Sequence, residues 1–195
     1  MNSSRSLRQR QIINESIKLI HNKGIQGLTI KNIAEAIHLT EGAVYRHFKS
    51  KDDILSAILD DFKENLNQMI QTEINKNIPA LEKLKTVLNH LINKFCANPH
   101  IVSVIFSDEI FVNKKILHDK IIDIIQQNNK CFAKIAASGQ KSNEIRNDIN
   151  ADELAIIIMG SFRMVVKNWQ LKKHSYSLKN RGNDFFASLF KLISK

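Results

Sequence analysis

The sequence has few of the residues that mark disulfide-rich or β-rich proteins. Of its 195 residues, two are cysteine, two are proline and six are glycine. Cys96 and Cys131 form no Cys-x-x-Cys pair and lie near no histidine at zinc-finger spacing, which argues against a disulfide scaffold or a cysteine metal site. Because proline and glycine are common in turns, so few of them argue against a β-rich fold, which needs many turns. We therefore expect an all-α protein in a reducing compartment.

Long apolar runs are also missing. The longest uncharged stretch, Phe95 to Ser107, is shorter than the ~20 apolar residues that a membrane helix needs. The charged first ten residues are not followed by the apolar core of a secretory signal. The expected location is the cytoplasm, with no membrane partner.

Catalytic and cofactor-binding motifs are absent as well. The sequence contains no Gly-rich phosphate loop, no Gly-x-Ser-x-Gly elbow and no His-Glu-x-x-His, and its seven histidines are scattered. Cys96 lies among apolar residues, where packing explains a thiol better than nucleophilic catalysis does. We expect a protein that is not an enzyme and that uses no cofactor and no metal.

Positive charge, in contrast, is abundant. The formal net charge is +10, and residues 1–51 contain nine basic residues against three acidic ones. A basic segment of this kind favours a polyanionic partner, with nucleic acid ahead of an anionic membrane surface. An ordinary solvated surface explains the charge alone equally well.

Helical periodicity runs through almost the whole chain. It predicts a first helix from Leu7 to about Asn22, a short second helix capped by Thr29, and a third capped by Thr40 and ending near Phe48. A capping box at residues 50–53 opens a long fourth helix. Further helices are expected over about 81–95, between Pro99 and Ser107, and over 117–135, 151–171 and 178–193, with a loop over 138–150.

The second and third helices form a helix-turn-helix pattern within the basic segment. At about 100° per residue, Val44 and Phe48 face the core of this small domain. The opposite face consists of Gly42 and Ala43, which permit close approach to a major groove, and Arg46, which can reach base edges or a phosphate. Tyr45 and His47 flank this face, and Lys49 and Lys51 add charge beside it. The alternative is a generic three-helix packing unit with incidental basic residues.

Residues Thr29 to Leu55, TIKNIAEAIHLTEGAVYRHFKSKDDIL, resemble the DNA-binding segment of the TetR (tetracycline-repressor) family of bacterial transcription regulators. The spacing of Gly42, Tyr45, His47, Phe48 and Lys51 carries the resemblance. It implies that Thr29, Thr40, Tyr45, His47 and Lys51 contact phosphates and that Gly42, Ala43 and Arg46 lie nearest the bases. Many members have a second aromatic residue where this chain has Arg46.

The resemblance is looser in the rest of the chain. Residues 144–155 are similar to the loop before the penultimate helix of many members, which use their last two helices to form a dimeric four-helix bundle. The corresponding helices here span 151–171 and 178–193 and are apolar enough for such a bundle. The alternative is that these apolar residues only fill the core of the monomer.

A ligand cavity among the middle helices is also implied by the resemblance. Apolar side chains that can line it are Phe95, Phe106, Phe111, Phe132, Met159, Phe162 and Trp169, although aromatics at helical spacing more often form plain core. Arg163 is a lone cation in an apolar stretch, where an unpaired charge is costly. It can pair with an anionic effector, reach a carboxylate across a dimer, or extend to water.

These observations predict an all-α protein of about nine helices. Residues 1–51 form a three-helix helix-turn-helix domain, and residues 52–195 form a helical domain for ligand binding and dimerisation. The predicted function is a one-component transcription regulator, a repressor that binds a near-palindromic double-stranded DNA operator as a homodimer and is released by a small apolar effector. The alternative function is a helical carrier of hydrophobic molecules without sequence-specific DNA binding.

Overall fold

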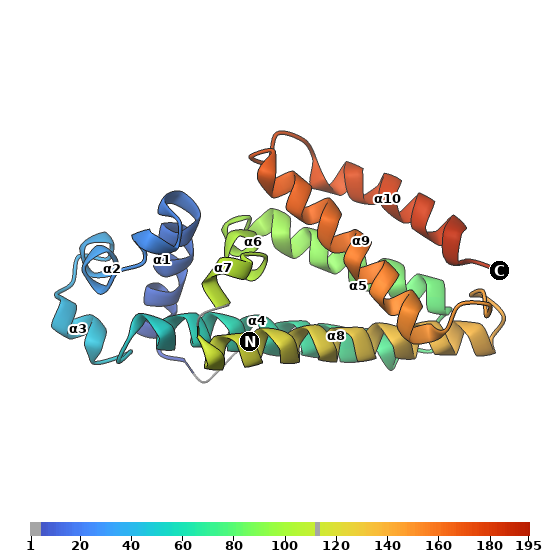
Figure 1. The fold of residues 1–195 in the computed structure, drawn as a ribbon, viewed down its shortest axis with the longest axis horizontal. Helices are drawn as coiled ribbons and strands as arrows, with labels where there is room; N and C mark the ends of the chain where they lie inside the picture. Colours follow the sequence, from blue (N-terminus) through green and yellow to red (C-terminus); the bar gives the residue numbers. More distant parts are fainter. Residues whose placement is uncertain (1–4, 112–113) are drawn as a thin grey trace. The chain divides into compact units, whose positions relative to one another are not determined.

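The computed structural model describes residues 5–111 and 114–195, and all regular elements in these residues are helices (Figure 1). The prediction of an all-α fold is confirmed, and the described residues form ten α-helical segments and one 3-10 segment. They are α1 (Leu7–Lys23), η1 (Ile25–Gly27), α2 (Ile30–Ala36), α3 (Glu41–Tyr45), α4 (Lys51–Ile74), α5 (Ala80–Ala97), α6 (His100–Ile105), α7 (Asp108–Phe111), α8 (Lys115–Lys141), α9 (Ala151–Leu171) and α10 (Leu178–Ile193).

The chain folds into two compact units. Unit 1 comprises Met1–Asn65 and Pro99–Asp123, and unit 2 comprises Leu66–Asn98 and Ile124–Lys195. Two helices, α4 and α8, each begin in unit 1 and end in unit 2. The functional boundary expected after residue 51 stays a prediction, because these units are defined by packing alone.

The helix-turn-helix segment lies in unit 1. Helix α2 begins after Thr29, and a turn containing His38 in the left-handed conformation, with a φ of 55°, leads to α3. The prediction that the third helix reaches Phe48 is wrong, because α3 ends at Tyr45. The backbone tightens there, since the N–H of His47 bonds to the carbonyl of Val44, three residues earlier.

Helix α1 packs against α6 within unit 1, and two histidine rings meet at this contact. The ring centroids of His21 and His100 lie 4.3 Å apart, and Nδ1 of His21 lies 2.8 Å from Oγ of Ser103. Burial, reinforced by the nearby charge of His100 when protonated, lowers the pKa of His21. The folded protein therefore disfavours a proton on this ring.

This contact predicts that unit 1 loses stability in mild acid. Above the ordinary histidine pKa of about 6.5, His21 is neutral in both the folded and the unfolded chain. As the pH falls through that value, the unfolded chain takes up a proton that the folded chain resists, so the free energy of unfolding decreases. Thermal unfolding between pH 7.5 and 5.5 measures the effect, and His100→Gln should reduce the pH dependence. An unchanged dependence in that variant would assign the effect to other groups.

Ion pairs join the first half of α4 to the start of α8 and to Lys114, the residue before it, in unit 1. The three lysine–aspartate pairs are Asp52 with Lys114, Asp60 with Lys120, and Lys63 with Asp123. In unit 2, Asn67 bonds to Gln127 and Gln71 to Cys131. Four of these five pairs are separated by 60 residues, so the two helices run parallel in a constant register within each unit.

Unit 2 consists of the later parts of α4 and α8 together with α5, α9 and α10. The predicted bounds of the last two helices agree with the structure. The loop predicted from residue 138 is wrong at its start, because α8 continues through Gly139 to Lys141. None of the helices within residues 5–111 and 114–195 is long and apolar enough to cross a membrane.

Candidate nucleic-acid interface

The orientation predicted for α3 is observed at most positions, although Ala43, which was predicted to face outward, is half-buried. Val44 and Phe48 are buried in unit 1, whereas Gly42, Tyr45 and Arg46 are exposed. Tyr45 keeps 51% of its surface exposed. The exposed face of α3 therefore combines small, aromatic and cationic residues.

Both predicted threonine caps form. The Oγ1 atom of Thr29 accepts a hydrogen bond of 3.0 Å from the N–H of Asn32, and Oγ1 of Thr40 accepts one of 3.2 Å from the N–H of Ala43. These bonds fix the first turns of α2 and α3. Because each hydroxyl accepts in its cap, its own O–H remains able to donate to a phosphate oxygen.

Gly42 is not required by the packing of the protein itself. A Cβ atom built at Gly42 would come no closer than 4.0 Å to any neighbour, and that neighbour is Oγ1 of Thr40. Its backbone is also helical, so the position needs no special conformational freedom. A glycine that the fold does not need, on an exposed helix face, is suited to close approach by a ligand such as DNA.

A short network fixes the start of α4, shortly after α3. The N–H of Asp53 donates to Oγ of Ser50, and the carboxylate of Asp53 accepts a 3.0 Å bond from the N–H of Lys49. This is the predicted capping box with its return bond shifted by one residue, from Ser50 to Lys49. The side chains of Lys49 and Lys51 are exposed at this helix start.

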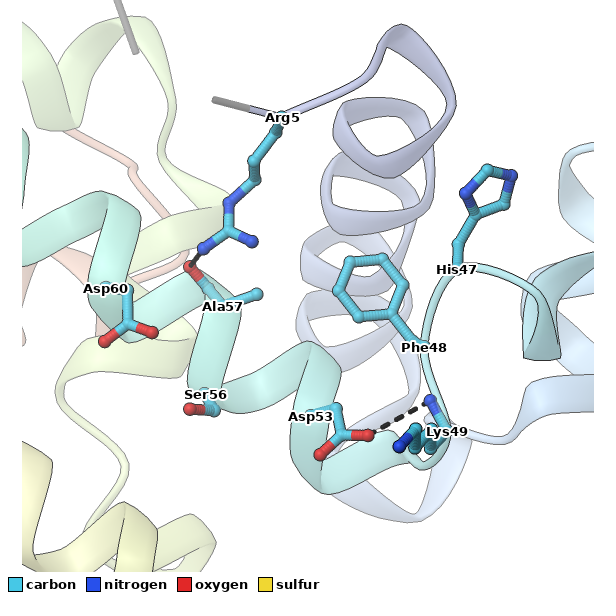
Figure 2. A pocket seen from close by; sticks show the side chains of 8 residues that line it. All are labelled: Arg5, His47, Phe48, Lys49, Asp53, Ser56, Ala57 and Asp60. Carbon is cyan, nitrogen blue, oxygen red and sulfur yellow. Dashed lines mark hydrogen bonds between the residues drawn. The ribbon is translucent and has the colours of Figure 1, made fainter. Parts of the chain in front are cut away.

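A hollow of about 440 Å³ lies next to this network (Figure 2). Arg5 reaches it from the segment before α1, donating to the carbonyl of Ala57 and, at 2.6 Å, to the carboxylate of Asp61. The hollow is lined by Arg5, His47, Phe48, Lys49, Asp53, Ser56, Ala57 and Asp60. Half-buried His47 thus stands between α3 and α4.

The residues predicted to line an effector pocket fall into both units. Phe106 and Phe111 belong to unit 1, and the others belong to unit 2. In unit 2, Phe95 and Phe162 stack with ring centroids 6.4 Å apart, and Phe132 is fully buried. Met159 and Arg163 are half-buried on α9.

Trp169 occupies a different environment within unit 2. Its ring lies 4.1 Å from that of His174, and its Nε1–H donates a 3.0 Å hydrogen bond to the carbonyl of Tyr176. These contacts hold the turn between α9 and α10. Trp169 therefore has a clear structural role besides the pocket role predicted for it.

The structure offers little for metal or thiol chemistry. Burial raises the pKa of both the Cys96 and the Cys131 thiol, although Lys179 and Lys134 oppose the shift. Neither thiol is therefore primed as a nucleophile. Within residues 5–111 and 114–195, no three histidine, cysteine or acidic side chains come together as a metal site.

Two features of the surface were not identified from the sequence. Glu41, at the first position of α3, is exposed beside Gly42. A row of exposed apolar residues also runs along α9, formed by Ile156, Ile157, Met164 and Leu171. The very apolar segment 154–166 signalled the second feature, but only the packing shows which of its residues face outward.

Two family models match the chain. The first, described as bacterial regulatory proteins of the tetR family, matches residues 12–58. The second, described as the C-terminal region of YsiA-like proteins, matches residues 62–192. The first match covers the helix-turn-helix segment, and the second covers most of the remaining chain.

Individual relatives agree with these matches. The fatty acid metabolism regulator protein of Bacillus subtilis is 26% identical over 182 residues, which cover 92% of each chain. The solved structure of the fatty acid degradation regulator FadR from Bacillus halodurans superposes with a TM-score of 0.86 at 20% identity, covering 96% of this chain and 97% of that one. The crystal structure of FadR from Bacillus subtilis in complex with stearoyl-CoA superposes with a TM-score of 0.77 at 24% identity. The match covers 93% of this chain and 97% of that one.

Proposed function

Because the chain belongs to the TetR family of bacterial transcriptional regulators, we propose that it represses transcription from a near-palindromic operator that it binds as a homodimer. A fatty acyl thioester of coenzyme A releases it from that operator. The observation that carries the DNA-binding part is the exposed face of α3, where a glycine that the fold does not need stands beside Tyr45 and Arg46. As a member of this family, the protein is a regulator and not an enzyme.

The exposed row on α9 supports the homodimer. Ile156 and Met164 keep 52% and 66% of their surface exposed, and Gly160 lies midway between them with open space where its side chain would be. Two antiparallel copies of α9 crossing at Gly160 bring Ile156 of one copy against Met164 of the other. A residue without a side chain at the crossing lets the helices approach closely.

Charges at the two ends of α9 favour the same arrangement. Its first turn carries exposed Asp152 and Glu153, whereas exposed Lys172 and Lys173 follow its last turn. An antiparallel pair places opposite charges next to each other, and a parallel pair places like charges together. α10 would complete the interface, with Leu192 55% exposed near its end.

The relative with bound stearoyl-CoA supports an acyl-CoA effector. The acyl chain requires an apolar cavity, for which the stacked Phe95 and Phe162 are suited. Arg163 lies one residue from Phe162 and can balance a negative charge on the ligand, besides the other two roles open to it. α4 would transmit binding, because it starts at Lys51 in the DNA interface and ends in unit 2.

Selection of bound sequences from a random double-stranded DNA pool tests the regulator, followed by affinity measurements at two salt concentrations. We expect a near-palindrome that outcompetes bulk DNA. Stearoyl-CoA should then reduce operator binding at least tenfold, whereas free coenzyme A should not. No enriched motif, with binding that vanishes as salt rises, would favour the carrier instead.

Substitutions on α3 and α4 should separate backbone contacts from base contacts. Lys51→Ala and Tyr45→Phe should weaken binding to all DNA sequences by a similar factor, because phosphates are the same in every sequence. Arg46→Ala should instead change which bases are preferred, since Arg46 lies on the outward face of α3. Competition binding on a panel of operator variants measures both effects. Unchanged base preference in Arg46→Ala would remove the base-reading role.

A further inference from the structure

Glu41 stands apart from the other acidic residues around it. From Arg5 to Asp61, every other acidic side chain has a hydrogen bond or ion pair: Glu15 with Lys18, Glu35 with Lys31, Asp52 with Lys114, Asp53 with the Lys49 backbone, Asp60 with Lys120, and Asp61 with Arg5. Glu41 is exposed, and within residues 5–111 and 114–195 its carboxylate has neither kind of partner.

The position of Glu41 bears on how the protein would bind DNA. It is the first residue of α3, and its neighbour Gly42 is exposed on this helix, which is proposed to enter the major groove. Exposed Arg46 directly follows the end of the helix. A carboxylate near DNA is repelled by the phosphates, so by itself it weakens binding to every sequence. A hydrogen-bond donor on a base would offset that repulsion, because a carboxylate accepts hydrogen bonds and donates none.

We propose that Glu41 is a specificity-determining residue that accepts a hydrogen bond from the exocyclic amine of a cytosine in each half of the operator. This inference rests on the proposed operator binding. In the major groove, donors are offered only by N4 of cytosine and N6 of adenine. Adenine presents its N7 acceptor beside the amine, and guanine and thymine present acceptors that repel a carboxylate. Cytosine is therefore the base that Glu41 selects.

A purely structural role makes a different prediction. An acidic residue in the first turn of a helix interacts favourably with the helix dipole, and this stabilises α3 whether or not DNA is bound. Removing Glu41 would then lower thermal stability and weaken binding to all sequences alike. Base preference at a single operator position is the readout that separates the two roles.

The test is sequence selection from a random double-stranded DNA pool with the full-length wild type, Glu41→Gln, Glu41→Ala and Glu35→Gln, with thermal unfolding of each protein. Glu41→Gln keeps the size of the side chain and should move the preference at one position of each half-site from cytosine to adenine, which an amide can contact with two hydrogen bonds. Glu41→Ala should reduce the preference for cytosine there about tenfold. Glu35→Gln removes the same charge from α2 and should leave all preferences unchanged.

The outcomes distinguish this inference from the proposed function. If the wild type enriches an operator and both Glu41 variants enrich it with the same preference at every position, Glu41 does not read a base and the inference is wrong. If the wild type enriches no sequence, the proposal of operator binding is wrong, and the inference about Glu41 is then wrong as well. A changed preference in Glu35→Gln would likewise overturn it, because the effect would then follow charge and not position.

Discussion

Met164→Asp should convert the protein from a dimer to a monomer and reduce operator affinity by more than 100-fold. Met164 is 66% exposed on α9, in the row that includes Ile156 and Leu171. In the proposed antiparallel pair, the new carboxylate would be buried against Ile156 of the other copy without a partner, which disfavours association strongly. A monomer binds only one half-site, and losing the linked second half-site lowers affinity by roughly 10²–10⁴.

Sedimentation or light scattering over a range of concentrations measures the dimer, and operator binding is measured on the same samples. The control is Ile116→Asp, which adds the same charge at an apolar residue that is 71% exposed on α8, outside the proposed interface. It should leave both the dimer and the affinity unchanged. A Met164→Asp protein that stays dimeric would place the interface elsewhere, and the loss of both dimers would show a general effect of charge.

The helices and the outward face of α3 could be predicted because each depends on residues close together in the sequence. Thr29 and Thr40 cap the turns that follow them, and Val44 and Phe48 lie four residues apart on one buried face. Such local signals require no knowledge of the rest of the fold. The predicted bounds of α9 and α10 agree with the structure for the same reason.

Features that depend on distant residues could not be predicted in this way. The pairing of α4 with α8 at a separation of 60 residues is set by tertiary packing, and no local pattern reveals it. The sequence also does not show which isoleucines of the run 156–158 face outward. In the structure Ile158 is buried, and Ile156 and Ile157 are exposed. An acidic residue such as Glu41 is common in the first turn of a helix. That its carboxylate has no hydrogen-bond or ion-pair partner can be seen only from the surrounding structure.

Gly139 shows how a local sign of a helix end can mislead. A glycine at this point, followed by polar residues, is a common sign of a helix end, and this led to the wrong start for the loop. In the structure α8 continues past Gly139 and ends at a cap centred on Asn143, whose φ of 65° is left-handed. The N–H groups of Glu144 and Ile145 donate hydrogen bonds of 2.8 and 3.1 Å to the carbonyl of Gly139.

Gly139→Leu should therefore destabilise the protein by about 3 kcal/mol, although leucine is the better helix former. A Cβ atom at this position would lie 2.6 Å from Cδ1 of Ile145 and 2.8 Å from Cβ of Ala80. The end of the isoleucine can move, but Cβ of Ala80 is fixed to the α5 backbone, so the added side chain must push α5 or the returning segment away from α8.

Denaturant unfolding compares Gly139→Leu with Ser138→Leu, which places the same side chain at the preceding, exposed position of α8. The Ser138 variant should keep its stability within about 0.5 kcal/mol, because no packed neighbour is displaced. Equal stability in both variants would mean that α5 and the returning segment accommodate the side chain freely. A loss confined to Gly139→Leu would show that this glycine is retained for the close approach of Ile145 and Ala80, and not as a helix end.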